Sequence, residues 1–180
     1  TLKKIIGNGA LEFPHGIALL NDTAMYVSAN KGNYLYRANI EDLDNVDFQT
    51  VVAEKNAALN KNSSLDIHEV VFSPDQSKYF LSCQTSNEVR VMDTKKDTLI
   101  AVINTGKYPV EFTFSTKYHL LFVSCMEDDT YISEGIKGSI TAIDYTNNTK
   151  ITTIKSGYQP HGLQANDDKD LLYIVNRNIA

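Results

Sequence analysis

Residues 67–104 read IHEVVFSPDQSKYFLSCQTSNEVRVMDTKKDTLIAVIN, a stretch in which four short apolar runs are separated by polar turns. β-Branched and aromatic residues favour strands, whereas Pro, Asn, Asp and Ser gather in turns. No helical spacing of apolar residues is sustained through the stretch. We therefore expect four consecutive antiparallel strands, at Glu69–Ser73, Lys78–Gln84, Glu88–Asp93 and Thr98–Asn104.

The same template occurs four times along the chain. Each copy has an alternating run, a polar turn and then an apolar run led by Tyr or Phe, and the copies start at Pro14, Ile67, Pro109 and Pro160. The interval between the second and third starts fits a four-stranded propeller blade of roughly 40–50 residues. The two longer intervals contain polar insertions, around Glu41–Asn62 and around Glu127–Lys137. Within the first insertion, Ala53–Leu59 is the one stretch that favours a helix.

These repeats predict an all-β chain, a β-propeller of four-stranded antiparallel blades with about three and a half blades present. We expect residues 1–13 to hold the last strand of a preceding blade, at Leu2–Ile6, and a turn. Residues 14–66, 67–108 and 109–159 are then complete blades, and residues 160–180 are half a blade. Because the resulting strands do not close a ring of four-stranded blades, we expect the chain to be part of a longer polypeptide.

Composition excludes several classes of protein. Lys and Arg number 17 against 22 Asp and Glu, which gives a net charge of −5. Since an acidic surface without a basic stripe repels phosphate backbones, we expect no nucleic-acid partner. No apolar run approaches the roughly 18 residues of a membrane span. Cys83 and Cys125 occupy equivalent places in neighbouring copies, too far apart for a disulfide, and we expect two buried free thiols.

The later copies resemble a known family. Gly138–Asp144 (GSITAID) and Asn148–Ile154 (NTKITTI) look like the signature of the YVTN family of seven-bladed β-propellers, and Asn87–Asp93 (NEVRVMD) repeats it. The first copy departs from this pattern, because Asn33–Arg37 is not followed by the usual Asp-Thr turn. The resemblance implies a seven-bladed ring, export to the periplasm or cell surface with any signal peptide absent from this chain, and binding to a protein partner or to other domains of a longer chain.

Propeller geometry singles out one set of polar residues. The first strand of each blade lies innermost, so equivalent residues at its start converge on the central channel. His15, His68 and His161 share one repeat position, which Val110 fills in the third copy, and Glu69 and Glu111 take the next position. Imidazoles and carboxylates bind divalent metals and cationic ligands. We therefore name His15, His68, Glu69, Glu111 and His161 as candidate ligand-binding residues.

A structural role for the same histidines is the alternative, because a Pro-His-Gly turn can serve only to hydrogen-bond a neighbouring blade. We also expect adjacent blades to hold the side chains several ångströms too far apart for a tight tetrahedral site. A water-bridged or organic ligand is then favoured over a bare zinc ion. No cofactor is predicted, and a divalent metal at this ring is left open.

The sequence favours a non-catalytic binding or scaffolding module and names no catalytic residue. No nucleophile elbow, His-Glu-x-x-His helix or phosphate-binding loop is present. Asp128-Asp129 and Asp167-Asp168 lie in polar turns, where we expect solvated charges, and His119 is expected at the surface. The composition of the insertion Asp128–Gly135 fits a surface that contacts a partner, and it fits equally well a surface loop that the fold tolerates. The alternative function is a lactonase-like hydrolase, or the propeller part of a redox enzyme with a metal at the channel mouth.

Overall fold

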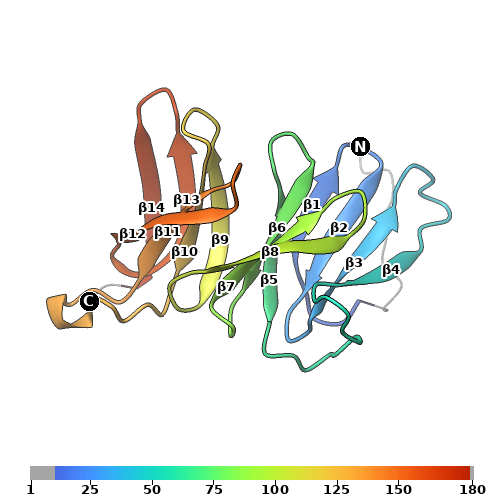
Figure 1. Cartoon of the computed structure of the whole chain (residues 1–180), viewed down its shortest axis with the longest axis horizontal. Coiled ribbons are helices and arrows are strands. Elements are labelled where there is room, and N and C mark those ends of the chain that lie inside the picture. The colour runs from blue at the N-terminus through green and yellow to red at the C-terminus, as the bar shows by residue number, and fades with distance from the viewer. Residues whose placement is uncertain (1–10, 179–180) are drawn as a thin grey trace.

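The structure is a computed structural model that describes residues 11–178, and these residues form an all-β fold (Figure 1). The strands are β1 (Pro14–Leu20), β2 (Ala24–Ala29), β3 (Tyr34–Asn39), β4 (Phe48–Val52), β5 (Ile67–Phe72), β6 (Lys78–Cys83), β7 (Glu88–Asp93), β8 (Thr98–Asn104), β9 (Pro109–Ser115), β10 (Leu120–Cys125), β11 (Ser139–Asp144), β12 (Thr149–Lys155), β13 (Tyr158–Asn166) and β14 (Leu171–Asn178). A single 3₁₀ turn, η1 (Ile132–Glu134), is the helical element among the described residues.

The strands form four antiparallel sheets that follow one another in chain order. The orders are β1-β2-β3-β4, β5-β6-β7-β8, β9-β10-β11-β12 and the two-stranded β13-β14. Figure 1 shows the sheets side by side, from the blue first sheet to the red last one. This arrangement confirms the predicted partial β-propeller, and we refer to the sheets as blades 1 to 3 and the half-blade. The strand predicted at Leu2–Ile6 lies outside the described residues.

Apolar side chains hold the blades together face to face. One buried cluster joins blades 1 and 2 and includes Tyr26, Tyr79 and Leu81. A second cluster joins blades 2 and 3 and includes Phe80, Leu121 and Ile143. Each strand of a blade alternates its side chains between two faces, so a blade with a neighbour on both sides can bury residues on both faces. Blade 2 lies between both clusters and does so.

The two cysteines follow the same pattern. Cys83 lies in the cluster between blades 1 and 2, and Cys125 lies in the cluster between blades 2 and 3. Both are fully buried free thiols, as predicted. Burial raises the pKa of both thiols, which keeps them in the neutral form. They serve as small apolar packing residues.

Two aspartates join neighbouring blades, and a third corrects the sequence analysis. Asp97 of blade 2 accepts hydrogen bonds from Arg37 at 2.7 Å and Tyr26 at 3.1 Å, both on blade 1. Asp167 accepts a bond from Ser115 Oγ at 2.5 Å and so ties the half-blade to blade 3. Asp128 is only 4% exposed and accepts bonds from Ser139 and Thr130. The expectation of a solvated charge was therefore wrong for Asp128, which is buried and hydrogen-bonded within its own blade, whereas Asp167 lies in a partly exposed polar turn.

The helix expected at Ala53–Leu59 is absent from the structure. Asn33 holds this segment in an irregular loop, since its side-chain amide donates to Ala58 O at 3.0 Å and its oxygen accepts from Asn60 N at 2.8 Å. Asn56 has a φ of 58°, in the left-handed region that ends a helix. A tertiary contact across 25 residues thus overrides the local helix preference.

The part of the chain that the structure describes contains no helix with the length and hydrophobicity of a membrane span.

Candidate functional site

The five candidate residues all lie at the starts of the innermost strands, and we call them the hub cluster. His15 is on β1, His68 and Glu69 are on β5, Glu111 is on β9 and His161 is on β13. In each blade the register with the second strand shifts at this point, for example between Ile67 and Glu69. A bulge bends the strand and re-aims its side chains. The repeated bulge therefore turns the hub residues toward one another.

Three serines that sequence reasoning missed fix the position of the hub. Ser28, Ser82 and Ser124 lie on the second strands, opposite the bulges. Each hydroxyl donates to a backbone carbonyl near the start of the first strand of the next blade. The acceptors are His68 O at 2.5 Å, Val110 O at 2.7 Å and His161 O at 2.7 Å. Each hydroxyl also accepts a backbone N–H from the bulge of its own blade, from Gly16, Glu69 or Glu111. The recurrence of Ser two residues after the aromatic was the available sequence signal.

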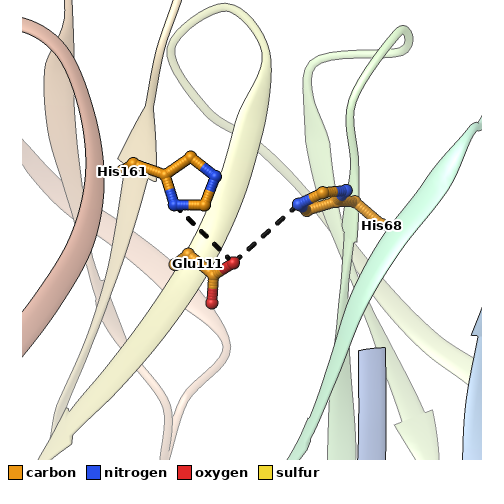
Figure 2. A group of neighbouring side chains, drawn as sticks. All are labelled: His68, Glu111 and His161. Atoms are coloured by element: carbon orange, nitrogen blue, oxygen red, sulfur yellow. Dashed lines mark ion pairs between the residues drawn. The ribbon is translucent and has the colours of Figure 1, made fainter. Parts of the chain in front are cut away.

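A carboxylate lies between two imidazoles at the centre of the hub cluster. Glu111 Oε1 is 3.9 Å from His68 Nε2 and 3.9 Å from His161 Nδ1. Figure 2 shows the Glu111 carboxylate between the two rings, which come from different sheets. One potential ligand atom from each of the three residues lies within 4.8 Å of the other two. This spacing is tighter than the sequence analysis expected for side chains on separate blades.

His68 is the most buried member of the cluster. Its side chain is 8% exposed, and no described residue offers a hydrogen bond to either ring nitrogen. Burial lowers the pKa of His68 to about 3, and the neighbouring His15 and His161 add to this effect. The ring is therefore neutral at physiological pH and has a free nitrogen lone pair. A buried polar group without a partner is rare in proteins and calls for an explanation.

A second His–Glu pair flanks this group. His15 Nδ1 is 3.9 Å from Glu69 Oε2, and the His15 ring lies over the His68 ring with centroids 3.6 Å apart. Burial raises the pKa of Glu69 to about 7, opposed by a bond from the Val70 amide and reinforced by the charge of Glu111. The Glu69 carboxyl occupies the space where a side chain on Gly16 would begin. Gly16 therefore makes room for Glu69 to reach His15.

An open cavity of about 440 Å³ adjoins the cluster. Its polar residues are His15, Glu69 and Glu111, at the starts of β1, β5 and β9. Further along the same strands its walls are apolar, with Ile17, Leu19, Phe72 and Phe112. No lysine or arginine is among the described residues that line it. The cavity thus combines carboxylates with apolar walls, a setting that favours positively charged ligands over anions.

The structure thus brings all five candidate residues to one place. Val110, which fills the histidine position in the third copy of the repeat, is buried. His119 lies away from the hub, exposed at the turn before β10, with its ring 6.1 Å from that of Tyr145. The insertion Asp128–Gly135 contains η1 and packs at the rim, where Lys155 lies 4.9 Å from the centre of the Tyr131 ring.

Several solved structures are similar to this chain over most of its length. A Kuenenia stuttgartiensis hydrazine synthase is 17% identical with a TM-score of 0.72, over 98% of this chain and 45% of that one. A putative 6-phosphogluconolactonase from Bacteroides uniformis is 16% identical with a TM-score of 0.67, over 91% and 47%. A chain of a mitotic checkpoint complex is 16% identical with a TM-score of 0.62, over 89% and 42%.

These likenesses define the class of protein as a β-propeller. Sequence identity of 16–17% shows the fold alone, and the chain spans less than half the length of each of these neighbours. No protein-family model and no curated protein sequence matches the chain. The named neighbours serve unrelated processes, which agrees with the general rule that function belongs to sites placed on a fold rather than to the fold.

Proposed function

We propose that this chain is part of a non-catalytic binding module, a β-propeller that takes a cationic ligand or partner group at its hub. The observation that carries the proposal is the convergence of three imidazoles and two carboxylates from four sheets beside a cavity of about 440 Å³. The interior of the hub offers acceptors and negative charge, and the apolar walls offer contact area. A group with a positive head and an apolar body fits this combination best.

The proposal extends to the setting of the protein. The repeats resemble those of the YVTN family, which supports a seven-bladed ring in an exported, periplasmic or cell-surface protein. A protein partner, or other domains of a longer chain, would then present the group that enters the hub. Cell fractionation of the source organism, with antibodies to this sequence, tests the location. Recovery in the cytoplasm would contradict that part of the proposal.

A matched pair of probes tests the hub itself. We expect hexylammonium to shift the NMR signals of the His15, His68 and His161 rings, while hexanoate, with the same apolar tail, leaves them unchanged. The exposed His119 is the internal control, and its signal stays in place with both probes. The double variant Glu69→Gln/Glu111→Gln should lose the response, because it removes both carboxylates from the cavity. A response to hexanoate equal to that of hexylammonium would refute the charge argument.

The alternative is a hydrolase, and one observation favours it. Glu69 is a buried carboxyl with a pKa of about 7, a value suited to proton exchange at neutral pH, and it faces His15 in the cavity. Among the neighbours in fold is a putative 6-phosphogluconolactonase. A phosphorylated lactone, however, would meet two carboxylates and no basic side chain among the described residues of the cavity. Lactone hydrolysis that Glu69→Gln abolishes would establish the hydrolase in place of the binding module.

A further inference from the structure

We propose that His68, Glu111 and His161 form a binding site for one transition-metal ion of the zinc class. This inference rests on the proposed hub site and names a ligand for it. The three residues come from three different sheets, on β5, β9 and β13, and their side chains converge between the sheets (Figure 2). The ion would thus join blades 2 and 3 and the half-blade at one point.

The distances between the potential ligand atoms of the three residues are close to those around a bound ion. Zinc binds nitrogen and oxygen at about 2.0–2.2 Å, so the ligand atoms of a tetrahedral site lie roughly 3.4 Å apart. Glu111 Oε1 is 3.9 Å from a ring nitrogen of each histidine, and the whole set lies within 4.8 Å. Rotation of the Glu111 and His161 side chains would have to close this gap. Glu111 and His161 have room to rotate, since their side chains are 29% and 39% exposed.

The second, independent observation is the unsatisfied ring of His68. A buried polar atom that lacks a partner costs about 1–3 kcal/mol. His68 is 92% removed from solvent and faces Glu111 with Nε2, yet neither ring nitrogen has a hydrogen bond within the described chain. A metal ion would give Nε2 a partner where the described chain supplies none.

The donor set indicates which metals bind. Two imidazoles and one carboxylate suit zinc, cobalt and iron(II), whereas magnesium and calcium prefer sites made of oxygen alone. Three protein ligands leave a coordination position open. Since Glu111 also lines the cavity, the open position is within reach of a molecule held there. The metal and the cavity would then form one composite binding site.

His15 and Glu69 support this site without binding the ion. The His15 ring stacks against His68, and its Nδ1 faces Glu69 rather than the cluster centre. The Glu69 carboxyl accepts the Val70 amide at 3.1 Å and is packed against Gly16. These contacts limit how His68 can tilt. His15→Ala removes this support and no ligand, so we expect it to keep one zinc per chain with a lower affinity.

The test is zinc binding to the chelator-treated protein at pH 7.5, measured by calorimetry and by elemental analysis after dialysis. We expect one zinc per chain, and a cobalt spectrum typical of tetrahedral nitrogen and oxygen ligands. Glu111→Gln and His161→Gln should each weaken binding by about 100-fold or more, because each removes a direct ligand. The surface variant His119→Asn is the control and should bind zinc within about threefold of the natural chain.

Since His68→Ala alters a buried position and can disturb folding, the argument depends on the two more exposed ligands. The thermal midpoint gives a second readout: zinc should raise it in the natural chain and in His119→Asn, but not in Glu111→Gln. Binding that survives in the double variant Glu111→Gln/His161→Gln would overturn the site, and so would the absence of stoichiometric zinc. If zinc fails to bind while hexylammonium still shifts the hub histidines, the metal inference falls and the proposed function stands. If both probes fail, both proposals fall.

Discussion

The junction between blades 2 and 3 and the half-blade β13-β14 are built from the same sequence repeat, yet they differ sharply in packing. At the junction, Phe80 and Leu121 are fully buried in one apolar cluster. On β14, Leu171, Tyr173 and Val175 are 50%, 49% and 67% exposed. The alternating pattern is similar in both places. A repeat of this kind presents an apolar face, and only the next repeat determines whether that face is buried.

The same comparison applies to the hub. Ser82 and Ser124 each bridge their own bulge to a carbonyl of the following sheet. In the half-blade the residue opposite the bulge is Val175, which lies between the pairs Pro160–Asn176 and Leu163–Ile174. Valine has no hydroxyl, and no described blade follows β14. The tether therefore exists where another described sheet follows in the chain, and it is missing on β14, which no described sheet follows.

The largest effect is expected from shortening equivalent core residues in the two regions. Leu81 is fully buried, and Leu81→Ala should lower the free energy of unfolding by about 2–5 kcal/mol, because a cavity remains in the core. Ile174 occupies the equivalent place on β14 but is only partly buried, so Ile174→Ala should cost clearly less. Urea denaturation of both variants measures the difference. Equal losses would show that the half-blade is as well packed as blade 2.

The next effect depends on pH and compares two hub histidines. Because the pKa of His68 falls from 6.5 in the unfolded chain to about 3 in the fold, its contribution to stability is complete above pH 6.5 and declines as the pH falls toward 3. His68→Gln should remove that decline, which amounts to about 3 kcal/mol between pH 7 and pH 4. Urea denaturation at both pH values measures it. His161→Gln is the control for the loss of a hub imidazole that is not deeply buried, since its side chain is 39% exposed.

The smallest of the three effects concerns the serine tethers. Ser124→Ala leaves the carbonyl of His161 and the amide of Glu111 without their partner and should cost about 1–3 kcal/mol. It should also weaken zinc binding by about tenfold, since both residues are proposed ligands. Val175→Ser is the matched control in the half-blade, where a change of less than about 0.5 kcal/mol is expected. A Ser124→Ala variant with unchanged stability and zinc affinity would show that the tether does not position the hub.

Much of the architecture followed from local pattern. The strands of the second repeat were predicted within two residues, since β5 begins at Ile67 where Glu69 was expected, and β7 and β8 have the predicted bounds. Convergence of the hub residues followed from their shared repeat position. The missed features depend on distant partners. Asn33 keeps residues 53–59 out of a helix, and Ser139 and Thr130 hold Asp128 in a buried position.

The sequence by itself determined the repeat, the strand alternation and the set of residues that face the channel, because each depends on neighbours along the chain. Only the tertiary structure decided how near those residues come to one another and which of them lose their solvent. The bulges and the serine tethers bring Glu111 to 3.9 Å from two histidines. Burial then leaves His68 neutral and without a hydrogen-bond partner among the described residues. Distances and burial depend on how whole sheets pack together, and a linear pattern of residue types does not specify that packing.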